Sequence, residues 1–194
     1  MSPRAAIGAL RAAVPTQIMT ELQRVLVVSY AFPPVGGAGV QRSVKLLKYL
    51  GDFGWVGDVL TVDNPSVPLR DDSLLCDVPP TAHVYRARTL EPSYATKEAT
   101  WGEVTSPQAT ASPWRSLRGR ALSVARRAAV PDPQVLWLPG AVLALRRVLR
   151  GPLRPAAVLL SAPPFSQFLL GPVVRQHPGV GLVYDYRDEW STAR

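Results

Sequence analysis

The chain has 194 residues, of which 47% are hydrophobic, and this length suits one ordinary domain with an apolar core better than two domains. Its single cysteine, Cys76, excludes an internal disulfide, and its two histidines argue against a zinc cluster. No stretch approaches the roughly 18 uninterrupted apolar residues that a membrane span needs. We therefore expect a cytoplasmic protein without a metal site.

Positive charge is concentrated in one region of the chain. The formal net charge is +8, and residues 111–154 contain nine arginines and a single acid, Asp132, so this region accounts for the whole excess. A basic patch of this kind can attract phosphates, anionic lipid or nucleic acid. We expect no nucleic-acid partner, because no recognition motif is present and few aromatic residues lie among the arginines.

Residues 1–22 differ from the sequence that follows them. Arg11 interrupts the apolar run of this segment early, which fits a secretory signal poorly. Met19 lies just before the first strongly apolar run. We therefore expect residues 1–22 to be a disordered extension or the product of a misassigned start, and residues 23–194 to form the domain, incomplete at its C-terminal end.

The first elements in chain order form a βαβ unit. Residues 24–29 are a short continuous apolar run, typical of a strand buried on both faces of a parallel sheet. A loop rich in proline and glycine follows, and apolar residues then recur at helical spacing over residues 40–50. Residues 56–62 predict a second strand that ends at Asp63. Such a crossover is right-handed almost without exception.

Strands and helices continue to alternate along the chain. Further strands are predicted at residues 82–87, 156–161 and 180–186, and helices at residues 114–129, 141–150 and 165–176. Residues 88–112 lack periodicity and predict a long loop. The pattern indicates an α/β fold, a Rossmann-like open parallel sheet with helices on both faces.

In open α/β sheets, ligands bind outside the carboxyl ends of the strands, and three loops are expected there. The first loop contains Gly36, Gly37 and Gly39 and opens a helix, whose free N–H groups and partial positive charge suit phosphate. Arg42 in the first helical turn adds a formal charge. A tight turn without a ligand is the alternative interpretation.

The glycine loop departs from the common nucleotide-binding motifs. Starting at Gly37 the sequence reads G-A-G-V-Q-R, so Arg42 replaces the third glycine of the dinucleotide fingerprint. The P-loop pattern is absent. Asp63 could still serve as a ribose-binding acid, which leaves an NAD(P)-type Rossmann oxidoreductase as an alternative.

The second loop, after the strand at residues 156–161, contains Ser161, Pro163, Pro164 and Ser166. Pro164 suits the first turn of the helix that follows, and neither proline can continue the strand. These four residues either contact substrate or only end the strand.

The third loop, after the last strand, contains Asp185, Arg187, Asp188 and Trp190. Carboxylates at this position can accept hydrogen bonds from sugar hydroxyls or act in acid–base catalysis, so Asp185 and Asp188 are the catalytic candidates. Arg187 can hold a phosphate or pair with a neighbouring acid. The structural alternative is an Arg–Asp pair that only stabilises the loop.

Together the loops resemble one family. Residues 29–50, SYAFPPVGGAGVQRSVKLLKYL, look like the opening of family 4-type glycosyltransferases of the GT-B fold, with a strand, FPP, a Gly-Gly loop and a helix that contains QR. VPDPQVLWLP is similar to a connector in one branch of that family. SAPPFS and YDYRDEW resemble the later motifs of that branch, S-x-P-P-x-S and D-x-R-D-x-W.

The resemblance implies a role for each loop. The chain would be the N-terminal, acceptor-side domain of a two-domain enzyme, and the donor-binding C-terminal domain would be missing. In the family the glycine loop reaches the donor diphosphate, a role carried here to Gly36, Gly37 and Gly39 with support from Arg42. Asp185, Arg187 and Asp188 match D-x-R-D and would face the cleft, although Glu189 stands where relatives have an apolar residue or proline.

The resemblance also implies the partners. These would be a nucleotide-sugar as donor substrate and a sugar or lipid-linked acceptor, with no cofactor and no catalytic metal. Residues 114–127 could dock on an anionic membrane at the inner face, or they could form an ordinary helix that packs on the sheet. We expect little or no transfer by residues 1–194 alone, and a non-catalytic truncated binding module is a further alternative.

Overall fold

The computed structural model describes residues 23–67, 70–94 and 131–187. Within these residues, five strands form one all-parallel sheet in the order β3-β2-β1-β4-β5. The strands are β1 (Gln23–Val28), β2 (Trp55–Val62), β3 (Val84–Ala87), β4 (Ala157–Ala162) and β5 (Gly181–Tyr186). The α-helices are α2 (Ala38–Leu50), α5 (Leu138–Arg150) and α6 (Gly171–Arg175), and the 3-10 helices are η2 (Gly51–Phe53), η3 (Ser73–Asp77), η4 (Pro133–Trp137) and η5 (Phe165–Leu170).

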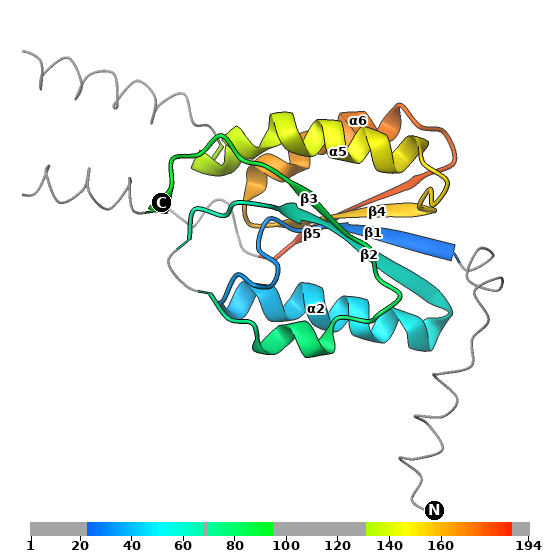
Figure 1. The fold of residues 1–194 in the computed structure, drawn as a ribbon. Coiled ribbons are helices and arrows are strands. Elements are labelled where there is room, and N and C mark those ends of the chain that lie inside the picture. Colours follow the sequence, from blue (N-terminus) through cyan, green and yellow to red (C-terminus); the bar gives the residue numbers. More distant parts are fainter. Residues whose placement is uncertain (1–22, 68–69, 95–130, 188–194) are drawn as a thin grey trace, which may run out of the picture.

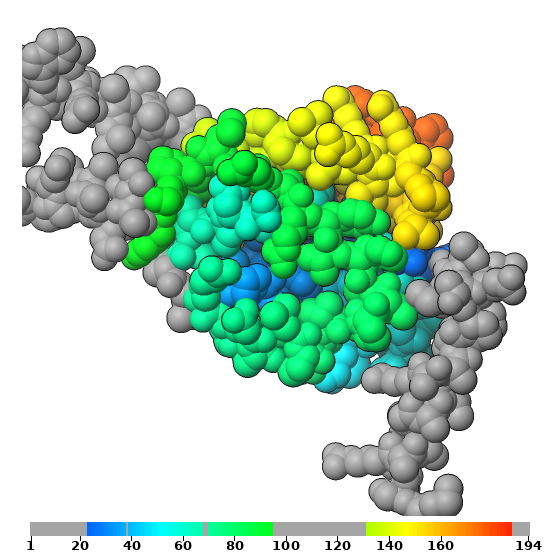
Figure 2. All heavy atoms as spheres, in the orientation of Figure 1, coloured from blue at the N-terminus to red at the C-terminus, as the bar shows by residue number. Residues whose placement is uncertain are grey.

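Helices lie on both faces of the sheet, so the predicted open α/β fold is confirmed (Figure 1). α5 and α6 cover one face, and α2 with η3 covers the other. In the view of Figure 2, residues 70–94 run across the molecule between these two layers. The larger apolar cluster lies under α5 around the fully buried Trp137, whose indole N–H donates to the Ala87 carbonyl at 3.0 Å. The ring of Trp137 also meets Tyr30 edge-on, with 5.5 Å between the ring centroids.

Two glycines allow α2 to begin and pack where it does. Val40, Val44 and Leu47 are buried at helical spacing against the sheet. Gly37 precedes the helix with a φ of 118°, a conformation that side chains other than glycine rarely adopt. A Cβ at Gly57 of β2 would lie 2.6 Å from the Leu47 side chain, so glycine permits the close approach of helix and strand.

The prediction of one continuous helix over residues 165–176 is wrong. The segment consists of the 3-10 helix η5 followed by the short α6. Pro172 lacks the N–H that a helix interior would use, and it therefore suits the start of a new helix. Gly171 also lies so close to Tyr184 that a Cβ would be 1.9 Å from the tyrosine oxygen. Packing against β5 thus sets the junction.

Other boundaries shift slightly. α5 begins at Leu138, earlier than expected, with Pro139 in its first turn, and β3 is shorter than the predicted strand at residues 82–87. The predicted extension at residues 1–22, most of the loop at residues 88–112 and the basic helix at residues 114–129 lie outside the described residues. Within the described ranges, no helix has the length and apolar character to cross a bilayer.

Candidate functional site

The three loops that the sequence singled out begin at one edge of the sheet. β1, β4 and β5 are adjacent and parallel, with Val28 of β1 beside Leu160 of β4. Ser161 pairs in register with Asp185. The carboxyl ends of these strands therefore bring the glycine loop, the Ser161 loop and the Asp185 loop together, as predicted.

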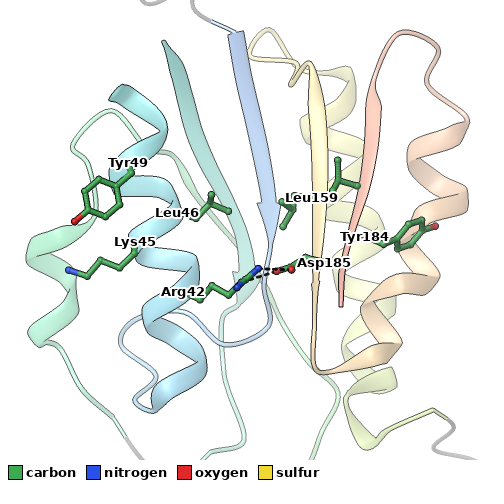
Figure 3. Close-up of a pocket in the computed structure, with 8 residues that line it drawn as sticks. Arg42, Lys45, Leu46, Tyr49, Leu159, Tyr184 and Asp185 are labelled. Carbon is green, nitrogen blue, oxygen red and sulfur yellow. Dashed lines mark hydrogen bonds and ion pairs between the residues drawn. The ribbon is translucent and has the colours of Figure 1, made fainter. Parts of the chain in front are cut away.

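Asp185 is the centre of the contacts between the loops (Figure 3). Its carboxylate accepts hydrogen bonds from Arg42 Nε at 3.1 Å and Arg42 Nη2 at 2.8 Å. It also accepts one from the Ser161 hydroxyl at 2.8 Å. The two-point Arg–carboxylate geometry fixes the orientation of both groups, although Arg42 is 60% exposed. The acid thus links α2, β4 and β5.

Arg187 lies against the start of α2. A Cβ at Gly39 would be 3.1 Å from Arg187 Nη2, so the guanidinium packs directly on the glycine backbone. The first turn of α2 contains no acid, and no side chain caps the helix. Among the described residues, Arg187 forms no ion pair. The start of α2 therefore has the Arg187 guanidinium packed on it, and Arg42 follows in the same helix, an arrangement that attracts an anion.

The residues that hold the glycine loop were not found from the sequence. The Ser43 hydroxyl of α2 donates to the Ser29 hydroxyl at 2.9 Å, and Thr61 of β2 donates to the Tyr30 carbonyl at 2.9 Å. The Tyr30 hydroxyl donates to Glu91 at 2.6 Å. Burial, together with this hydrogen bond, raises the pKa of Tyr30 far above its usual range, so the phenol stays protonated. In the sequence, the signal that could have identified these residues is a side chain with a hydroxyl group next to an apolar run.

The remaining predicted residues are less closely associated with this cluster. Ser166 is fully buried, and its backbone N–H donates to Asp132 Oδ2 at 2.8 Å. Pro163 is exposed and Pro164 is partly buried in the turn between β4 and η5. Gly36 is partly buried and directly precedes Gly37 in the loop. Asp188 and Trp190 lie outside the described residues, so the structure does not test their assignment.

A groove of about 460 Å³ adjoins the Arg42–Asp185 pair on the α2 face of the sheet (Figure 3). Its walls come from α2 on one side and from β4 and β5 on the other. It is lined by Arg42, Lys45, Leu46, Tyr49, Leu159, Val183, Tyr184 and Asp185. The groove is mostly apolar, with its charged groups contributed by α2 and by the end of β5.

Comparisons with known proteins provide no assignment. No family model, no curated protein and no solved structure matches the chain. Within the described residues, no group of three or more His, Cys, Asp or Glu side chains could hold a metal ion. The motifs and the geometry of the three loops are therefore the features from which a function can be inferred.

Proposed function

We propose that this chain is the acceptor-side domain of a GT-B-type glycosyltransferase, which transfers a sugar from a nucleotide-sugar to an acceptor. The observation that carries the proposal is the meeting of three motif loops at one edge of the sheet. Gly39 contacts Arg187, and Arg42 pairs with Asp185, across separations of more than a hundred residues. The motifs that resemble the family are thus also neighbours in space.

The positive part of the cluster suits a diphosphate. The backbone N–H groups at the start of α2 can donate to phosphate oxygens, and glycine lets the ligand approach closely. Arg187 lies beside the same helix start and can pair with a second phosphate oxygen. Arg42 is already engaged by Asp185, so we assign the direct phosphate contact to Arg187 and a supporting role to Arg42.

Asp185 is better suited to position groups than to move a proton. Both of its carboxylate oxygens accept hydrogen bonds from Arg42, and Oδ2 accepts a further one from Ser161. These bonds orient the carboxylate, whereas a general base needs a free lone pair aimed at the acceptor hydroxyl. We therefore propose that Asp185 holds the loops and a sugar hydroxyl, and that Asp188 is the stronger candidate for acid–base chemistry.

The test is a titration of the isotope-labelled full chain followed by NMR. Pyrophosphate, UDP and NAD⁺ are added separately, and the amide signals of residues 36–40 are monitored. We expect saturable shifts with pyrophosphate and UDP. Arg187→Ala should weaken binding by roughly tenfold or more, because a hydrogen bond to a charged group contributes about 1.5–3 kcal/mol. Arg175→Ala, which removes an exposed arginine of α6, is the matched control.

The same titration separates the alternative functions. Tighter binding of NAD⁺ than of UDP, with shifts at Asp63, would favour the oxidoreductase. Asp63 is exposed directly after β2, at the correct edge of the sheet for that role. Absence of any anion-dependent shift at residues 36–40 would refute the proposed diphosphate contact. Binding without transfer, when a donor-binding domain is supplied, would support a non-catalytic module.

One further element of the proposal concerns residues outside the described ranges. Docking of residues 114–127 on an anionic membrane, with a lipid-linked acceptor, stays a prediction. Co-sedimentation with vesicles tests it, since pelleting that is equal with neutral and anionic lipid would contradict an electrostatic docking.

A further inference from the structure

The two edges of the described sheet differ in length and in charge. β3 forms one edge with four residues, among them the exposed Arg86. β5 forms the other edge with six residues, and it contains no lysine, arginine or proline. Its one charged side chain, Asp185, is engaged by Arg42 and Ser161. Short length and exposed charge protect an edge strand against pairing with another chain, so β3 has this protection and β5 lacks it.

Apolar and aromatic side chains of β5 are exposed on both faces of the sheet. Val183 is 48% exposed on the α2 face, whereas Tyr184 and Tyr186 are 36% and 64% exposed on the opposite face. Figure 3 shows this alternation, with Asp185 turned toward α2 and Tyr184 turned away from it. Both tyrosine rings contact Phe168 of η5, with centroid distances of 5.1 and 4.6 Å. The strands inside a parallel sheet bury such side chains, so β5 has the composition of an interior strand at an open edge.

The backbone of β5 has hydrogen-bonding groups that face away from β4. The Gly181 N–H donates to the carbonyl of Ala156, which directly precedes β4, at 2.8 Å. Backbone groups of successive residues in a strand point to opposite sides, so those of Leu182, Tyr184 and Tyr186 point to the open side. A second strand presents donors and acceptors at the same spacing. The chemistry of this edge therefore specifies an extended backbone as its occupant.

We propose that the β5 edges of two copies of this chain pair as antiparallel strands, related by a twofold axis that passes between the two Tyr184 residues. In this register Tyr184 faces Tyr184 of the second copy, and Leu182 faces Tyr186. Every outward-facing N–H and C=O of the strand then has a partner, and the interface is closed because both copies use the same surface. The axis is perpendicular to the sheet, so the tyrosines of both copies meet on the same face.

Sedimentation velocity of the full chain over a range of concentrations tests the association. We expect monomers to convert to dimers and to no larger species, because the pairing leaves neither β5 edge open. Tyr186→Lys places a charge at the edge, and Leu182→Pro removes an outward-facing N–H. Each should raise the dissociation constant of the dimer roughly tenfold or more. Val84→Lys, the matched change at an exposed residue of the β3 edge, should leave it unchanged.

Cysteine cross-linking tests the register. Leu182→Cys and Tyr186→Cys are prepared separately, each with Cys76→Ser to remove the native thiol. Facing residues of a hydrogen-bonded antiparallel pair have Cα atoms about 5.5 Å apart. Two cysteines at the same position would lie about 13 Å or more apart, since four residues of strand separate them. We expect a short bifunctional maleimide to join the two variants in a mixture, and to join either variant to itself only weakly.

The proposal is overturned if the chain stays monomeric at every concentration, if it forms larger species instead of a dimer, or if both edge variants associate like the parent protein. Absence of cross-linking from the mixture, or equal cross-linking in the single-variant samples, would likewise overturn it. Circular dichroism checks the fold of each variant, and Tyr186→Lys, at an exposed position, stays informative if Leu182→Pro misfolds. None of these results concerns the diphosphate contact at Gly39 and Arg187, so the two proposals fail separately.

Discussion

The buried Arg24–Asp58 ion pair gives the sharpest prediction for stability. Arg24 is 5% exposed and Asp58 1% exposed, and two hydrogen bonds, of 2.8 and 2.6 Å, join them. Asp58 also accepts a hydrogen bond from the His83 backbone N–H at 2.8 Å. The pair therefore ties the beginning of β1 and the middle of β2 to the segment that enters β3. The hydrogen bond with Asp58 also raises the pKa of Arg24, which remains charged.

Asp58→Asn preserves shape but removes the countercharge. The amide NH₂ would face a donor of Arg24, and the guanidinium would remain buried without its partner. We expect a loss of about 3–5 kcal/mol in the free energy of unfolding, the usual cost of breaking a buried pair from one side. Total stabilities of domains are about 5–15 kcal/mol, so this single change would remove a large fraction of the stability.

Urea unfolding followed by tryptophan fluorescence provides the measurement, because Trp137 is fully buried. The exposed Asp52→Asn is the control and should change stability by less than about 0.5 kcal/mol. The double variant Arg24→Leu with Asp58→Leu should recover most of the loss, since two apolar side chains leave no buried charge. A loss below about 1 kcal/mol for Asp58→Asn, or a double variant as unstable as the single one, would refute the reasoning.

Three further changes have defined outcomes. Gly39→Ala adds a methyl group 3.1 Å from the neighbouring guanidinium, so we expect pyrophosphate affinity to fall several-fold while the midpoint of urea unfolding stays constant or rises, because alanine favours the helix. Gly171→Ala places a methyl group 1.9 Å from the oxygen of Tyr184, and calorimetry should show a destabilisation of roughly 1–3 kcal/mol; an unchanged melting temperature would contradict the packing. Hydrogen bonds from the two lysines of α2 lower the pKa of Asp77, so its contribution is present above the ordinary carboxyl pKa and is lost as the pH falls through the lowered value. Unfolding midpoints measured between pH 2 and pH 6 should therefore fall less steeply for Asp77→Asn than for the parent protein, and identical slopes would count against the assignment.

The sequence was sufficient for the fold class. Continuous apolar runs predicted strands buried on both faces, and the helical spacing of Val40, Val44 and Leu47 predicted α2, because both patterns are local and are read from neighbours along the chain. The junction at Gly171 could not be predicted in this way. Its form depends on the contact with Tyr184, which belongs to a different element.

For the candidate site, the amino-acid sequence showed which loops carry glycines, prolines and charges, and the alternation of strands and helices predicted that these loops share one edge of the sheet. The partner of each side chain, in contrast, depends on the three-dimensional packing. Asp185 pairs with Arg42, 143 residues away, rather than with Arg187, two residues further along the chain, and Arg187 instead lies on Gly39. Residue type and spacing describe local geometry, whereas these contacts depend on the position of α2 across the sheet, which is set by packing over long sequence separations.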